Sequence, residues 1–112
     1  MPDPAAANWR VHPDKIPRYL LSDATPAAAA KNRFFRSAGY TPEAWGILES
    51  ALTTHPATAL PHKSMTTIHG ERLVYRCDLP ASPNGGSYCI LSVWEQRSGG
   101  AWWLVTAYPQ SR

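Results

Sequence analysis

The chain has 112 residues, 44% of them hydrophobic, and a formal net charge of +3 at pH 7. This length fits one domain with a single core and excludes a second domain of ordinary size. The Lys and Arg residues are scattered, so the basic balance alone supports an acidic partner such as nucleic acid only weakly. No stretch has the length of a membrane span or the pattern of a signal peptide, so we expect a cytoplasmic protein without membrane contact.

The N-terminal residues predict a loose start to the chain. Residues 1–12 are rich in proline and alanine and have no apolar periodicity, which predicts a flexible arm before one α+β domain over residues 13–112. Trp9 is the one residue of this arm that could dock onto the domain. A short helical turn is expected between Pro13 and Leu21, because Pro17 suits a first helical position.

Two helices are predicted next along the chain. Thr25 can cap a helix, Pro26 suits its first turn, and Gly39 can adopt the left-handed conformation that ends it. We therefore expect a helix from Pro26 to Ala38. The second helix carries apolar residues at helical spacing until Pro56, and these are Trp45, Leu48 and Leu52.

The second half of the chain changes from helical periodicity to alternation. Every second residue from Leu73 to Leu79 is apolar or aromatic, which predicts a strand with one core face. Turn sequences at 83–86 and 98–100 delimit two further strands, and residues 64–69 are a fourth candidate. The order predicts an α+β fold in which two N-terminal helices pack on a three- to four-stranded antiparallel sheet.

The two cysteines lie inside the predicted strands. Cys77 and Cys89 show no metal-type spacing, which favours small core residues over metal ligands or a disulfide framework.

The last strand carries a hydroxyl and a phenol two residues apart. Alternation places Thr106 and Tyr108 on one face, together with Trp102 and Leu104. Such a pair could orient a phosphate or relay a proton, although both residues are also ordinary strand formers. The length of the 98–100 loop leaves open which face of the preceding strand meets this pair.

Other polar residues have both structural and functional interpretations. Arg76 lies mid-strand, where an arginine needs a carboxylate or phosphate, and Asp78 on the same face offers an ion pair. His55 ends the second helix, where an imidazolium would complement the helix dipole. Arg33 and Arg36 project away from the apolar stripe of the first helix and weakly suggest phosphate contacts. The histidine spacing does not match a metal site, so we expect no metal.

Five short motifs extend through the chain: Lys31-Asn32-Arg33-Phe34-Phe35, Gly39-Tyr40, Pro83-Asn84-Gly85, Ser92-Val93-Trp94 and Leu104-Val105-Thr106-Ala107-Tyr108-Pro109. On these motifs the chain, from about Lys15 to Pro109, resembles an uncharacterised bacterial domain family. That family occurs as small free-standing proteins and as the C-terminal tip of polymorphic and contact-dependent toxins. It is similar to the barnase, EndoU, colicin and RelE group of nucleases, which place helices before a four-stranded antiparallel sheet.

The resemblance implies a function and a set of site residues. It implies a toxin-like, metal-independent ribonuclease of a toxin–antitoxin or polymorphic toxin system, without a cofactor and with a cognate antitoxin or immunity protein. Cleavage would proceed by attack of the ribose 2′-hydroxyl, with Lys31 or Arg76 stabilising the phosphorane and His55 or Tyr108 moving protons. Thr106 would complete the catalytic set. The residues expected to bind RNA are Arg33, Arg36 and Lys63.

Two positions differ from the family pattern and suggest an alternative. The chain has Thr25 at the start of the stretch where the family has a His-Pro-x-Gly element, and Leu91 where the family has an arginine before Ser-Val-Trp. Loss of these side chains would leave a nuclease-like module that binds a cognate protein partner without cutting RNA.

Overall fold

The computed structural model describes residues 3, 6–12, 26–80, 82–97 and 100–110, without the side chains of 26–28, 30 and 31. Its elements are β1 (Trp9–Arg10), α1 (Pro26–Ser37), α2 (Trp45–Thr58), β2 (Leu60–Thr67), β3 (Gly70–Arg76), β4 (Ile90–Gln96) and β5 (Trp102–Pro109). The helical turn predicted near Pro17 and the cap predicted at Thr25 lie outside the described residues.

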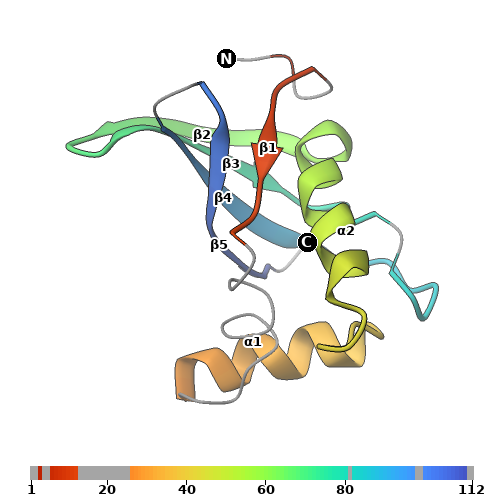
Figure 1. The fold of residues 1–112 in the computed structure, drawn as a ribbon. Helices are drawn as coiled ribbons and strands as arrows, with labels where there is room; N and C mark the ends of the chain where they lie inside the picture. Colours follow the sequence, from red (N-terminus) through yellow and green to blue (C-terminus); the bar gives the residue numbers. More distant parts are fainter. Residues whose placement is uncertain (1–2, 4–5, 13–25, 81, 98–99, 111–112) are drawn as a thin grey trace.

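The five strands form one mixed sheet in the order β1-β5-β4-β3-β2. Neighbouring strands are antiparallel except for β1, which pairs in parallel with β5. Figure 1 shows α2 standing beside the sheet and α1 lying across its lower end.

The predicted fold class is wrong, because a strand precedes both helices. Trp9 and Arg10, which the sequence places in the arm, pair with Trp102 and Trp103 of β5. The Trp102 N–H also donates to the Asn8 carbonyl oxygen at 2.9 Å. A strand of two residues is too short for any periodicity, so only its pairing with β5 defines it.

The core lies between the helices and one face of the sheet. The indole of Trp9 meets the rings of Tyr75 and Trp94 edge-on, with centroid separations of 5.5 and 5.1 Å. Phe35 of α1 and Leu52 of α2 are fully buried in the same cluster. Burying a side chain of this size contributes about 1.5–3 kcal/mol, so the N-terminal strand and both helices are held by one core.

The turn between α1 and α2 contacts the loop before β4. Gly39 has φ of 104°, and a Cβ built on it would lie 2.9 Å from the Cβ of Pro83. Asn84 Nδ2 donates to the Ser37 carbonyl oxygen at 2.9 Å, and the Asn84 N–H donates to that of Ala38 at 3.2 Å. The predicted left-handed ending of the first helix is confirmed, and the loop supplies two donors to its last carbonyls.

A β-bulge reverses the alternation of β5 before its last residues. Two neighbouring pairs of the ladder reveal it: Val93↔Thr106 and Trp94↔Leu104. Val105 is therefore an extra residue in β5, and Thr106 and Tyr108 project from the face opposite the core. The expectation that these two residues share a face with Trp102 and Leu104 is wrong, because Trp102 and Leu104 belong to the core.

The two cysteines form a disulfide, so the prediction of separate core thiols is wrong. β3 ends at Arg76, and Cys77 and Asp78 both have positive φ, at 72° and 43°. This turn brings Cys77 beside Cys89, and the Cys77 N–H donates to the Ile90 carbonyl oxygen at 2.8 Å. The pairing depends on which strands are neighbours, which the spacing of two cysteines does not encode.

Candidate functional site

A groove of about 350 Å³ opens on the sheet face opposite the core. Thr106 and Tyr108 of β5 line it on one side, and His62 and Lys63 of β2 line it on the other. The remaining lining residues come from the strands between and beside them: Met65, Arg72, Val74, Leu91, Val93 and Val105. Polar groups therefore stand at both margins of a floor that is largely aliphatic.

The strand register explains why these margins face each other. One row of paired residues crosses four strands: Lys63↔Val74, Val74↔Val93 and Val93↔Thr106. Directly paired residues project from the same face of a sheet. With neighbouring strands about 4.8 Å apart, the backbones of β2 and β5 are separated by about 14 Å. The side chains of Lys63 and Thr106 thus rise from opposite sides of a floor made by two valines.

Arg76 belongs to the next row on the same face. It pairs with Leu91, which pairs with Tyr108. Arg76 is half-buried and lies at the end of β3, whereas Asp78 follows the strand and is exposed. The structure therefore places Arg76 in line with Tyr108 but outside the lining of the groove.

Arg72 is fixed in the groove wall by a buried carboxylate. Arg72 Nε donates to Glu95 Oε2 at 2.9 Å, and Glu95 is only 7% exposed. Arg97 Nε lies 3.8 Å from Glu95 Oε1, and its guanidinium lies 5.8 Å from the centre of the Trp103 ring. One buried carboxylate thus orients two guanidinium groups, and this limits the rotamers that Arg72 can adopt.

His55 lies on the core side of the sheet, away from the groove. Its ring is fully buried, with Nδ1 2.7 Å from Ser92 Oγ and Nε2 bonded to the Cys77 carbonyl oxygen. Trp94 Nε1 donates to Ser92 Oγ at 2.9 Å, so the hydroxyl proton is free to point at Nδ1. The Nε2–H tautomer satisfies every group, because Nε2 then donates to the carbonyl.

Burial keeps this imidazole neutral. Desolvation lowers the pKa of His55 to about 4, against the opposing effects of the bond to Cys77 and the charge of Asp78. The ring has both nitrogens engaged and no exposed surface. The structure therefore does not bring His55 together with Thr106 and Tyr108. Instead, the hydrogen bonds of His55 tie α2 to β4 and to the end of β3.

The free energy of unfolding is expected to fall by about 2 kcal/mol between pH 7 and pH 5 through His55 alone. Its folded pKa, near 4, lies below the ordinary 6.5, so the unfolded chain takes up the proton first as the pH falls. The contribution of neutral His55 to the free energy of unfolding is complete above about pH 6.5 and is lost progressively as the pH falls to about 4. Urea titrations at both pH values test this. A His69→Asn variant, which removes an exposed histidine, should keep the dependence, whereas His55→Asn should lose it.

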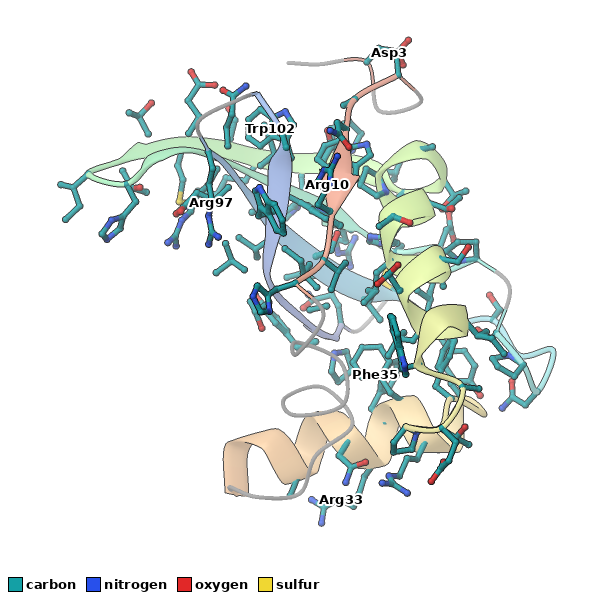
Figure 2. All side chains as sticks on the ribbon, in the orientation of Figure 1. Asp3, Arg10, Arg33, Phe35, Arg97 and Trp102 are labelled. Atoms are coloured by element: carbon teal, nitrogen blue, oxygen red, sulfur yellow. A yellow bond between two sulfur atoms is a disulfide. The ribbon has the colours of Figure 1, made fainter. Side chains whose placement is uncertain are left out.

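Of the cationic candidates on α1, Arg33 and Arg36 are not among the residues that line the groove. Lys31 lies in α1, and its side chain is outside the described part. Arg33 is exposed, and Figure 2 shows it pointing away from the sheet while Phe35 of the same helix points toward it. Arg36 Nε donates to Asn32 Oδ1 within the helix. Among the predicted RNA-binding residues, Lys63 is the one that lines the groove.

Two groove residues have no role in the sequence analysis. His62 precedes the strand that the sequence predicts at residues 64–69, whereas β2 already begins at Leu60. Arg72 belongs to the same alternating pattern as Arg76, so the sequence indicates which face of the strand it occupies. The sequence does not indicate which residues of the neighbouring strands lie beside it.

The described residues contain neither a metal-binding cluster nor a membrane-spanning helix. No cluster of three or more His, Cys, Asp or Glu residues in this part of the chain could hold a metal ion. Within the same residues, no helix is both long and apolar enough to cross a membrane.

Comparison with known proteins places the fold and the family. A chain of the contact-dependent growth inhibition toxin–immunity protein complex from Klebsiella pneumoniae 342 has a similar structure, with a TM-score of 0.72. The two sequences are 14% identical, and the match covers 98% of each chain, so it establishes a shared fold. No curated protein matches this sequence significantly. The model of the family "Domain of unknown function (DUF6883)" matches residues 2–111, and the chain therefore belongs to that family.

Proposed function

We propose that this chain is an RNA-cleaving domain of a bacterial toxin system and that the groove on the outer face of the sheet is its site. The observation that carries this proposal is the convergence of Thr106 and Tyr108 with His62 and Lys63 on one groove. These side chains supply a hydroxyl, a phenol, an imidazole and an ammonium group. Cleavage of a phosphodiester needs groups of these kinds, to transfer protons and to stabilise negative charge.

Two further features support a toxin system. The fold is similar to that of a chain from a contact-dependent growth inhibition toxin–immunity protein complex. The disulfide between Cys77 and Cys89 fits a domain that passes through an oxidising compartment, because disulfides are rare in proteins that stay in the cytosol.

The proposed reaction assigns a role to each polar group. The ribose 2′-oxygen attacks phosphorus, and the bond from phosphorus to the 5′-oxygen breaks, which leaves a 2′,3′-cyclic phosphate and a 5′-hydroxyl. Tyr108 and His62 are the two proton-transfer groups: one takes the proton from the 2′-hydroxyl, and the other gives a proton to the leaving 5′-oxygen. Lys63 and Arg72 neutralise the charge that develops on the phosphorane, and Thr106 donates a hydrogen bond to it. These roles require no metal ion.

The aliphatic floor and Arg76 complete the proposed substrate site. Val74 and Val93 offer an apolar surface for a ribose or a base between the polar margins. Arg76, in the row that ends at Tyr108, would bind the phosphate next to the cleaved one. His55 acts here as a positioning residue for β4 and takes no part in proton transfer.

One observation favours a second function, that of a binding module without catalysis. Leu91 lines the groove between Arg76 and Tyr108, at the position where the pattern described above has an arginine. An apolar residue there removes a cation from the centre of the site. Such a module would retain the fold for contact with a cognate immunity protein or antitoxin.

Incubation of the purified chain with single-stranded RNA in EDTA distinguishes these functions. The proposal predicts cleavage with cyclic phosphate and 5′-hydroxyl ends, which end-specific labelling detects. RNA that stays intact with and without Mg²⁺ would contradict catalysis and favour the binding module. Cleavage that appears only when Mg²⁺ is restored would contradict the metal-independent mechanism.

A further inference from the structure

β2 forms an open edge of the sheet. It pairs on one side with β3, and in the part of the chain that the structure describes no strand pairs with its other side. The strand has eight residues, and all except Met65 and Thr67 are exposed. Figure 1 shows the β2–β3 hairpin extending beyond both helices. An exposed strand edge of this length is a template for pairing with another strand.

The hairpin register identifies the backbone groups that point outward. Thr67 pairs with Gly70 across the two-residue turn, so this pair exchanges its hydrogen bonds within the hairpin. Bonded and non-bonded pairs alternate along an antiparallel ladder. Ser64 and Thr66 belong to the non-bonded pairs, and their N–H and C=O groups point to the outer edge.

The side chains along this edge define the chemistry of a partner. There is no Asp or Glu from residue 50 to residue 70, whereas His62, Lys63 and His69 lie on or beside β2. Leu60 begins the strand and Ile68 follows it in the hairpin turn, and these residues are 65% and 97% exposed. Pairing with β2 of a second copy would bring two basic edges together, which like-charge repulsion disfavours.

We infer that the outer edge of β2 binds an extended, acidic segment of a second protein by β-strand addition. Backbone groups of the segment pair with those of Ser64 and Thr66, and its carboxylates meet Lys63 and His62. Apolar residues of the segment would contact the exposed side chains of Leu60 and Ile68. Main-chain hydrogen bonds supply affinity in such complexes, and side chains supply selectivity.

The position of this edge has a consequence that rests on the proposed function. Lys63 and His62 also line the groove, so an acidic strand on β2 would compete with an RNA phosphate for the same two side chains. A partner bound here would inhibit cleavage without entering the floor of the groove. This is the behaviour required of a protein that protects a cell from the domain.

Peptide binding to the intact chain tests the edge directly. The probe is a fluorescent heptapeptide of alternating Glu and Thr, and its controls have Lys in place of Glu or Pro in place of two Thr residues. The acidic peptide should bind, and each control should bind at least roughly tenfold more weakly, because the Pro peptide loses main-chain hydrogen bonds and the Lys peptide loses the carboxylates that meet Lys63. Equal binding of the acidic and Pro peptides would show that charge alone holds the peptide, and this would overturn the inference of strand addition. Failure of every peptide to bind would overturn it as well.

Variants of Thr66 supply the matched comparison on the protein side. Thr66→Pro removes an outward N–H from an edge strand, where proline is tolerated, and Thr66→Ala keeps the backbone intact. Thr66→Pro should lose roughly tenfold in affinity for the acidic peptide, and Thr66→Ala should bind as wild type. Circular dichroism confirms folding, and Ser64→Pro repeats the test if Thr66→Pro does not fold. Unchanged binding by a folded proline variant would contradict strand addition.

RNA cleavage in the presence of the acidic peptide tests the consequence separately. The peptide should slow cleavage by wild type and not by Thr66→Pro, which itself should cut RNA at the wild-type rate. If wild type cuts no RNA, the proposed function fails, while the binding data still decide whether the β2 edge captures a strand.

Discussion

Replacing Tyr108 by phenylalanine is expected to lower the rate of RNA cleavage by roughly a hundredfold. The change removes one hydroxyl from the margin of the groove and leaves the ring that lines it. Proton transfer by a positioned group contributes about 10²–10⁴-fold to such reactions, whereas loss of one half-buried hydroxyl costs about 1 kcal/mol of stability or less. Cleavage rates under single-turnover conditions, together with urea titrations, separate the two effects.

Tyr88→Phe is the matched control for this prediction. The Tyr88 hydroxyl accepts a hydrogen bond from Asn84 Nδ2 at 2.6 Å, beside the end of α1 and outside the groove. Its loss should leave the cleavage rate within about twofold of wild type. The site would be misassigned if Tyr108→Phe and Thr106→Val both cut RNA as fast as wild type.

Replacing His55 by alanine is expected to lower the free energy of unfolding by about 3–4 kcal/mol. The imidazole is fully buried, and its removal leaves a cavity between α2, β3 and β4. It also leaves the Cys77 carbonyl oxygen without its donor and the Ser92 O–H without its acceptor, although Ser92 Oγ keeps the hydrogen bond from Trp94 Nε1. Domains of this size have about 5–15 kcal/mol of stability in total, so the variant would unfold at much lower urea concentration.

The adjacent residue provides the control for this substitution. Thr54 lies one position earlier on α2 and is exposed, so Thr54→Ala should change the free energy of unfolding by no more than about 0.5 kcal/mol. Ser92→Ala should fall between the two variants, because it leaves His55 Nδ1 and Trp94 Nε1 unpaired without opening a large cavity. A loss below about 1 kcal/mol for His55→Ala would mean that the network does not hold the helix to the sheet.

Local signals in the sequence place the helices well. Pro26 begins α1 as predicted, and Gly39 follows its end with positive φ. α2 extends to Thr58, past the end predicted at Pro56, because that proline lies in the last turn of the helix. These features depend on proline geometry and on left-handed glycine, and each is encoded within a few residues.

Features that depend on distant neighbours are missed. β1 has two residues and exists only because Trp9 and Arg10 pair with β5. The extra residue at Val105 is visible only when β5 is aligned with β4. The disulfide likewise follows from the turn at Cys77 and the course of β4, which place two cysteines side by side. Periodicity within one segment contains none of this information.

The candidate site likewise combines features encoded locally in the sequence with features that depend on distant strands. Thr106 and Tyr108 both follow the bulge, so their two-residue spacing still places them on one face, as the sequence indicates. Lys63 is among the residues that the sequence analysis expects to bind RNA, whereas its position opposite Thr106 follows only from the four-strand register. His55 shows the opposite case, because a histidine near a helix end gives no sign of being fully buried.

Mapping a short, non-cleavable RNA onto the isotopically labelled chain by NMR tests most directly whether the outer face of the sheet is the functional face. A 2′-deoxy substitution at the cleavage position keeps the ligand intact. Shift changes are expected at Lys63, Val74, Val93, Thr106 and Tyr108, with the exposed α2 residues Trp45 and Ile47 unaffected. Shift changes centred on α2, with the signals of the groove unmoved, would contradict it.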